Sequence, residues 1–223
     1  MGVRAAGAEG KETGRGGRRG GRPSRAEAER LGERILDAAT EAFLHEGYGG
    51  TSIEAIAKRA RISKRTFYSR FENKAALFGA VVHRVVERLR PPDPAGMFEG
   101  GSLEEILKRL ARYILRAALT PQALALHRVI LAEGTRFPEL AAVVAEQGGG
   151  REAVQRIAAL LERERTLGRV GSIDTVFAAT QFLQMVVGAP QRRALGMGPV
   201  LTETELDRWA DGTVRLFLKG CRG

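Results

Sequence analysis

The stretch that decides the fold is TSIEAIAKRARISKRTFYSRFENKAALF, residues 51–78. It predicts two short helices joined by a tight turn, followed by the start of a third helix. Thr51 stands three residues before Glu54, the spacing of a capping box, so we expect Thr51 to begin the first helix. The helical spacing i, i+3, i+4, i+7 predicts the buried face of that helix: Ile53, Ile56, Ala57 and Ala60.

The second helix is expected to follow Ser63 as its N-cap and to span about residues 64–71. Phe67 and Phe71 lie four residues apart and should face the core. The residues left on the outer face are Lys64, Arg65, Thr66, Tyr68 and Arg70. A short helix with a basic, hydroxylated and aromatic face fits the major groove of DNA. The stretch therefore predicts a helix-turn-helix unit with this second helix as the reader.

Lys74 stands in an unfavourable place for a cation. Asn73 is expected to cap a helix, and Lys74 lies in the first turn of that helix. A positive charge at a helix N-terminus opposes the helix dipole by roughly 0.3–1 kcal/mol. A DNA phosphate at that helix end would offset the penalty. We therefore expect Lys74 to contact the DNA backbone.

Residues 34–82, RILDAATEAFLHEGYGGTSIEAIAKRARISKRTFYSRFENKAALFGAVV, resemble the N-terminal DNA-binding domain of the TetR/AcrR family of bacterial transcription regulators. The landmarks include the first helix ending in Glu46-Gly47-Tyr48 and the series from Thr66-Phe67-Tyr68 through Phe71 to Lys74. The resemblance implies contacts with the DNA backbone from Thr51, Tyr68, Lys74 and often Arg70, and base reading by Lys64, Arg65 and Thr66.

Several of these positions keep two interpretations. Lys64 and Arg65 carry more charge than many relatives have there, and they either pair with guanine or simply add phosphate affinity. Thr51 is a helix cap with or without a phosphate contact, and Tyr68 is either a backbone contact or a surface aromatic residue. Arg70 is either a phosphate contact or a solvated charge.

Composition sets the class of protein. The 223 residues are enough for one or two domains with a real core, and the net charge of +10 favours a polyanionic partner. No apolar run approaches the roughly 20 residues that span a bilayer. The Gly- and Arg-rich N-terminus has no apolar signal region, so we expect a cytoplasmic protein.

The sequence lacks the residue spacings that are typical of catalytic and metal sites. Cys221 is the single cysteine, and His45, His83 and His127 are scattered without an HExxH spacing. No G-x-S-x-G elbow occurs either. We therefore expect neither an enzyme nor a metal or other cofactor.

Residues 1–25 contain eight glycines, seven basic and two acidic residues, and no aromatic residue. Such a segment buries too little surface to offset its ordering entropy, so it predicts a disordered basic arm. The arm either follows the DNA minor groove or is a non-specific tail.

The rest of the chain shows helical periodicity and no strand alternation, so the fold class is all-α. We expect a helix-turn-helix domain over residues 26–82 and a helical domain over residues 83–223. The expected helices outside the deciding stretch are 26–46, 74–90, 102–119, 121–133, 137–147, 150–167, 172–188 and 203–218, with a break at 189–199.

The second half, from Pro121 onward, resembles the AefR-like subset of C-terminal domains, which implies effector binding and dimerisation. The expected cavity-lining residues are Phe78, Val82, Val86, Leu110, Tyr113, His127, Phe137 and Met185, of which Tyr113 and His127 offer hydrogen bonds. The expected dimer interface uses Val176, Phe177, Thr180, Leu183, Gln184 and Val187 with Leu206, Trp209, Val214 and Phe217. Both sets have well-packed core as their alternative interpretation.

The resulting hypothesis is a homodimeric repressor that binds a palindromic operator in double-stranded DNA. A largely apolar small molecule would release it. The alternative is an architectural protein that binds DNA constitutively and needs no effector. The two differ in sequence preference, because a specific regulator prefers its operator by at least about a thousandfold.

Overall fold

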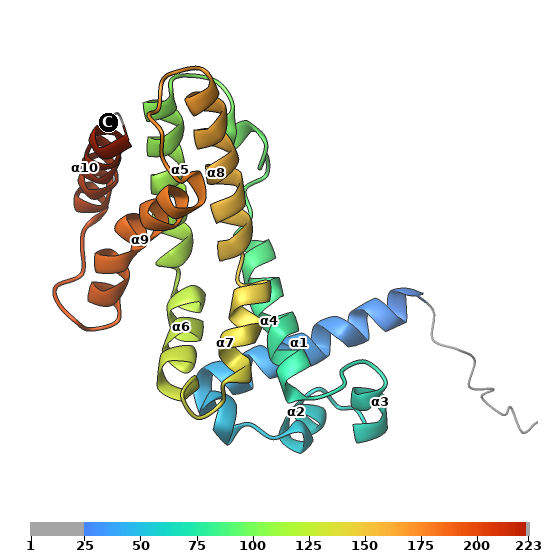
Figure 1. Cartoon of the computed structure of the whole chain (residues 1–223). Helices are drawn as coiled ribbons and strands as arrows, with labels where there is room; N and C mark the ends of the chain where they lie inside the picture. The colour runs from blue at the N-terminus through green and yellow to red at the C-terminus, as the bar shows by residue number, and fades with distance from the viewer. Residues whose placement is uncertain (1–24, 222–223) are drawn as a thin grey trace, which may run out of the picture.

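The computed structural model describes residues 25–221, and every regular element within that range is helical (Figure 1). The all-α prediction is confirmed for these residues. The elements are α1 (Arg25–Gly50), α2 (Ile53–Arg59), α3 (Lys64–Tyr68), α4 (Lys74–Arg88), the 3-10 helix η1 (Gly96–Phe98), α5 (Leu103–Ala118), α6 (Pro121–Glu133), α7 (Glu139–Gln147), α8 (Gly150–Thr166), α9 (Thr175–Ala194) and α10 (Glu203–Cys221). Of the predicted basic arm, residues 1–24 lie outside the described part.

Local side-chain caps start the helices around the reader. The Ser63 hydroxyl accepts from the N–H of Thr66 at 3.1 Å, and the Asn73 side-chain carbonyl accepts from the N–H of Ala76 at 2.8 Å. Both caps were predicted, because each depends on residues only three positions apart. The reader helix α3 ends at Tyr68 rather than near residue 71, since Ser69 already forms its C-cap.

The start of α2 differs from the capping-box prediction, which was wrong by one residue. Ser52 is the N-cap and accepts from the N–H of Ala55 at 3.1 Å. Gly47 breaks the end of α1 with a φ of 76°, and the Thr51 hydroxyl donates to its carbonyl at 2.6 Å. Thr51 is therefore turned inward and is only 2% exposed. The glycine break places Thr51 inside the corner between α1 and α2.

Helix α9 continues through Pro190, although the sequence predicted an end near residue 188. A proline inside a helix has no N–H for the carbonyl four residues earlier, here that of Val186. The indole N–H of Trp209 on α10 donates to this carbonyl at 3.0 Å and lies 3.2 Å from the carbonyl oxygen of Met185. The neighbouring helix thus supplies a donor that the proline lacks.

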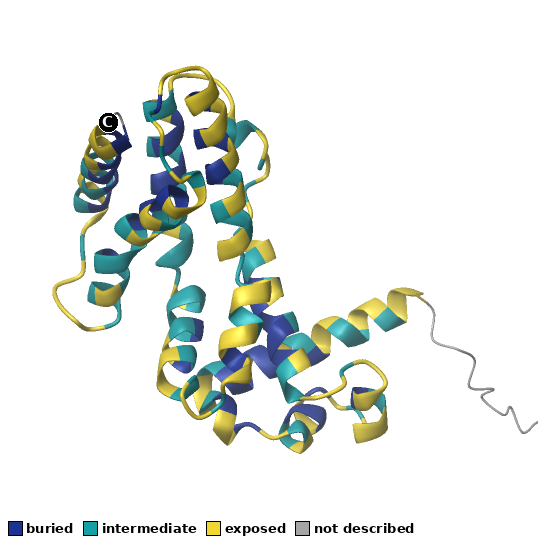
Figure 2. Cartoon of the chain, viewed as in Figure 1, coloured by how far each residue is buried: buried dark blue, intermediate teal, exposed yellow. Residues whose placement is uncertain are grey.

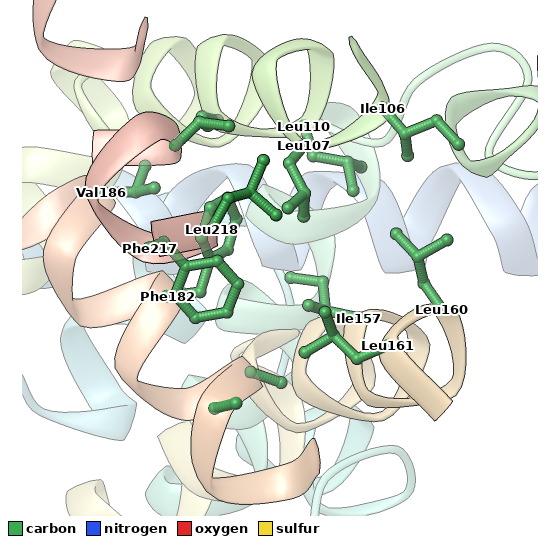
Figure 3. Packing of buried hydrophobic residues seen from close by; sticks show 14 of the residues in the cluster. Ile106, Leu107, Leu110, Ile157, Leu160, Leu161, Phe182, Val186, Phe217 and Leu218 are labelled. Carbon is green, nitrogen blue, oxygen red and sulfur yellow. The ribbon is translucent and has the colours of Figure 1, made fainter. Parts of the chain in front are cut away.

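The buried side chains form two clusters. The lower one joins α1, α2, α3 and α4 to α6 and α7 through residues that include Phe43, Phe67 and Phe78. The upper one joins α5, α8, α9 and α10, with the Phe182 and Phe217 ring centroids 5.0 Å apart (Figure 3). Leu126 of α6 and Leu140 of α7 belong to the lower cluster. Helices α6 and α7 therefore pack directly on the unit that carries the reader.

Two exposed segments belong to the unit that carries the reader. The α3 helix and the N-terminal half of α1 are largely exposed at one end of the molecule (Figure 2). Among residues 25–221, no helix combines the length and apolar character needed to cross a membrane.

Candidate nucleic-acid interface and ligand cavity

The reader helix α3 is fixed to the body of the protein by one buried ring. Phe67 is fully buried, and this anchor turns Lys64, Arg65 and Tyr68 outward. Tyr68 is 54% exposed, and its ring meets the Phe67 ring edge-on with centroids 5.3 Å apart. The Thr66 hydroxyl is half-buried and lies 2.9 Å from the Ser63 hydroxyl. The predicted reader residues therefore share one accessible face.

The two basic residues at the start of the reader are in different states. Lys64 forms an ion pair with Glu54 of α2, and this ammonium holds the pKa of the Glu54 carboxyl below its usual range. The Arg65 guanidinium makes no hydrogen bond or ion pair with any of the described residues, and the residue is exposed. For Lys64 to contact DNA, its ion pair with Glu54 must break. This costs little free energy, because exposed ion pairs are weak. Arg65 needs no such step.

The remaining predicted DNA contacts have partners within the protein, and Arg70 is the exposed one among them. The Lys74 ammonium donates to the carbonyls of Tyr48 at 2.8 Å and Thr51 at 3.1 Å, and it lies 4.3 Å from the centre of the Tyr48 ring. Burial lowers the pKa of Lys74. The Arg70 guanidinium donates to the carbonyl of Ala28 at 2.7 Å. The two carbonyls and the Tyr48 ring therefore stabilise the Lys74 ammonium at the helix start without a DNA phosphate. The contact of Lys74 with DNA stays a prediction.

Sequence reasoning missed the clamp that holds the α1–α2 corner. The Glu133 carboxylate, at the end of α6, accepts from the N–H of Tyr48 at 2.7 Å and from the N–H of Gly49 at 2.5 Å. A Cβ at Gly49 would lie 2.7 Å from Glu133 Oε2, so only glycine leaves room for this approach. The Gly47-Tyr48-Gly49 pattern is the available sequence signal, but Glu133 lies 85 residues from Tyr48.

Tyr48 also ties the corner to α7. Its hydroxyl donates to the Glu139 carboxylate at 3.3 Å, and its ring packs edge-on against Phe137 with centroids 5.1 Å apart. Burial and the neighbouring Glu139 carboxylate raise the pKa of Tyr48 to about 12. The corner beside the reader is therefore held from α4, α6 and α7 together.

A cavity of about 480 Å³ lies between α4, α5, α6, α8 and α9. Five predicted residues line it: Val82, Val86, Leu110, Tyr113 and His127. Three others do not: Phe78 is buried beside Phe43 and Tyr48, Phe137 packs on Tyr48, and Met185 packs against the upper core. The volume lies within the range of roughly 300–1,000 Å³ typical of pockets for small molecules.

The cavity wall is mainly apolar. Among its polar groups, the Tyr113 hydroxyl donates to the Leu89 carbonyl, and burial lowers the pKa of His127. His127 is therefore a neutral imidazole at neutral pH. Leu183, Gln184 and Val187 of α9, predicted for the dimer interface, also line this cavity.

The predicted interface residues on α10 are mainly core. Phe217 is 7% exposed, and Leu206 and Val214 are buried too, so all three pack within the subunit. Trp209 is half-buried and bonded to the α9 backbone. Thr180 is half-buried, with its hydroxyl bonded to the Val176 carbonyl. The large apolar side chains that α9 and α10 leave exposed are Val176, Phe177 and Leu216.

Comparison with known proteins identifies the family. The sequence profile described as "Bacterial regulatory proteins, tetR family" matches residues 35–81, and that of the "AefR-like transcriptional repressor, C-terminal domain" matches residues 105–220, just over half of the chain. The chain belongs to the TetR family of transcription regulators. It is therefore a DNA-binding regulator, and the family contains regulators rather than enzymes.

Solved structures and a curated relative support this TetR-family membership. The Flavonoid-responsive Regulator FrrA is 34% identical with a TM-score of 0.72, and the alignment covers 86% of this chain and 97% of that one. A TetR-family regulator from Mesorhizobium loti MAFF303099 is 31% identical with a TM-score of 0.70, with the same two coverages. HTH-type transcriptional regulator UidR of Escherichia coli K12 is 34% identical over 122 residues, which are 53% of this chain and span only 59% of UidR.

The two matched segments of this TetR-family regulator contain most of the two candidate sites. The reader helix lies inside the N-terminal match, and much of the cavity wall comes from residues of the C-terminal match. Residues 25–221 contain no group of three or more His, Cys, Asp or Glu side chains arranged to hold a metal ion.

Proposed function

We propose that this regulator is a homodimeric repressor that binds a palindromic operator and is released by a small molecule in the cavity. The observation that carries the proposal is the double role of α6. This helix lines the cavity through Leu126, His127 and Ile130, and its last residue, Glu133, holds the N–H groups of Tyr48 and Gly49 beside the reader unit. Residues 26–82 would read DNA in the cytoplasm, and residues 83–223 would sense the ligand and dimerise.

The coupling follows from simple geometry. Ile130 and Glu133 are three residues apart, so they lie within one turn of the same helix. A ligand that displaces the cavity-facing side of α6 would move the Glu133 carboxylate away from two N–H donors. The ligand shifts DNA affinity only to the extent that it binds the displaced arrangement more tightly.

The exposed residues Val176, Phe177 and Leu216 give the proposed dimer its contact surface. The N–H of Gly171 bonds to the carbonyl of Cys221 at 2.9 Å, so the start of α9 and the end of α10 lie together. A two-fold axis beside this end would pair identical surfaces and direct two α3 helices outward. The readers would then enter major grooves roughly 34–36 Å apart, which requires a palindromic site.

One relative and one family profile support ligand-controlled repression. FrrA is described as flavonoid-responsive, and it aligns along 97% of its length. The profile that covers residues 105–220 is described as that of a transcriptional repressor. We extend the ligand response and the repressor role to this chain on that basis, with the cavity as the structural support.

Selection from a random duplex DNA pool tests the DNA part of the proposal. Full-length protein and a form lacking residues 1–24 should enrich the same palindrome. Arg65→Ala should relax the preference at one base pair of each half-site, by about 1–3 kcal/mol, whereas Tyr68→Phe should weaken all sequences about equally. Tight, salt-sensitive binding without enrichment would instead indicate a constitutive architectural protein.

A further inference from the structure

The cavity has one charged end. Its charged lining residues are Arg90, Glu152 and Arg156, and each arginine pairs with Glu152. The Glu152 carboxylate accepts a hydrogen bond from Arg90 at 2.9 Å through one oxygen and forms an ion pair with Arg156 at 2.8 Å through the other. These side chains are 37–42% exposed, so they stand at the mouth of the cavity rather than at its base.

A second hollow of about 290 Å³ meets the cavity at this mouth. The two share Val86, Arg90, Gly149 and Glu152 as lining residues. The second hollow is the more polar one, because it adds His83, Glu87, Glu146, Gln147, Arg151 and Gln155. The Arg90–Glu152 pair therefore stands between the apolar cavity and a polar outer hollow.

Unused N–H donors, rather than net charge, favour an anion at the mouth, because Glu87 balances the one positive charge left by Arg90, Arg156 and Glu152. Two guanidinium groups share one carboxylate among the cavity-lining residues. Glu87 also pairs with Arg90, but through the same Nη2 atom, at 2.8 Å, so Nε and Nη1 of Arg90 hold no partner among the described residues. Glu146 and Arg151, which line only the outer hollow, offset each other in charge.

The first turn of α8 adds to this preference. Gly148, Gly149 and Gly150 line the cavity, and no side chain caps the N-terminus of α8. The free N–H groups of a helix start carry partial positive charge. Gly149 and Glu152 of this turn line both hollows, and the rest of the cavity wall is mainly apolar.

We propose that the effector is an amphipathic carboxylate. Its apolar body fills the cavity, and its carboxylate binds Arg90 and Arg156 at the mouth in exchange for Glu152. This ligand class deepens the proposed function and rests on it only for the effect on DNA. The exchange would also break the link that Glu152 forms between the end of α4 and the first turn of α8.

Matched probes test the proposal on the full chain without DNA. Decanoate and 2-naphthoate, each compared with its neutral amide, and decylamine as the cationic control are titrated by calorimetry and by thermal shift. At least one carboxylate should bind roughly tenfold more tightly than its amide, as expected for a charge-assisted hydrogen bond. Equal binding of each pair, tightest binding of decylamine, or no binding of any probe would overturn the proposal.

Variants separate recognition from a structural ion pair. Arg90→Gln and Arg156→Gln should each remove most of the carboxylate preference. Glu152→Gln should strengthen carboxylate binding, because it removes the competing anion, and should leave amide binding unchanged. If Glu152→Gln binds the carboxylate and its amide more weakly, the Arg90–Glu152 ion pair is only structural. That result would overturn the proposed exchange of Glu152 for the ligand carboxylate. Arg151→Gln, confined to the outer hollow, is the matched control and should keep the preference.

Operator binding is measured separately with the same probes. A carboxylate preference without any change in operator affinity would uphold the ligand class and contradict release by an effector. A loss of operator affinity caused equally by carboxylate and amide would uphold effector release and contradict the ligand class.

Discussion

The corner between α1 and α2 is held by more directional polar bonds than the packing between α9 and α10. Directional polar bonds close the corner, with Glu133 and Lys74 each contacting two backbone groups. Apolar rings close the other region, where Phe182 and Phe217 pack beside buried aliphatic residues. A few directional bonds switch between discrete partners, whereas close-packed apolar layers resist small displacements. On this basis we expect the corner to transmit a change in the cavity and the α9–α10 pair to stay fixed.

Phe182→Ala should give the largest loss of stability in either region. Phe182 is fully buried in the upper cluster, and removing a buried ring costs about 3–5 kcal/mol in the free energy of unfolding. Urea unfolding measures the loss. Phe177→Ala is the control on the same helix, since Phe177 is 62% exposed and should change subunit stability by less than about 0.5 kcal/mol.

The Phe177 variant also sharpens the interface proposal. Sedimentation should show weaker dimerisation of Phe177→Ala even where the fold is unchanged. Equal stability losses for the two phenylalanine variants would contradict the assignment of Phe182 to the core and Phe177 to the interface.

Glu133→Ala should weaken the corner and operator binding together. It leaves the N–H groups of Tyr48 and Gly49 without their acceptor, at a cost of about 1–3 kcal/mol in stability. Amide hydrogen exchange at residues 48 and 49 should accelerate, and operator affinity should fall. Glu146→Ala on α7 is the control, and it should change neither quantity. Unchanged exchange at both amides would contradict the clamp.

Trp209→Phe should cost about 1 kcal/mol, because the Val186 carbonyl then loses the donor that replaces the proline N–H. The cost should shrink when Pro190→Ala is present, since alanine supplies that N–H within α9. A double-mutant cycle from urea unfolding measures the coupling. Additive effects of the two substitutions would contradict this compensation.

His127→Gln should have the smallest effect, visible as a change in pH dependence. Burial lowers the pKa of His127 in the folded protein below its ordinary 6.5, so the unfolded chain takes up this proton at a higher pH. The stability contribution is complete above about pH 6.5 and is lost as the pH falls below that value. Urea unfolding at about pH 7.5 and pH 5.5 should show a smaller difference in the variant. An unchanged difference would contradict the burial effect.

Local contacts and contacts between distant segments differ in how far the sequence predicts them. Ser63, Asn73 and the Phe67 anchor depend on neighbours within four residues, so the reader unit follows from local patterns. The Thr51 capping box failed because the Gly47 break shifts the helix start to Ser52. Glu133 and Trp209 act on backbone groups 85 and 23 residues away, and only the packing of helices shows those contacts. The sequence predicted Phe217 at the dimer interface because it does not show which helix face packs inside the subunit.

The most direct test of coupling between cavity and reader needs no ligand. Ala123→Trp places an indole in the cavity beside α6, and operator affinity is measured for this variant, for Glu133→Ala and for the double variant. We expect Ala123→Trp to weaken operator binding about fivefold or more in the presence of Glu133, and far less in its absence. The same loss with and without Glu133 would contradict the claim that α6 transmits the state of the cavity through this carboxylate.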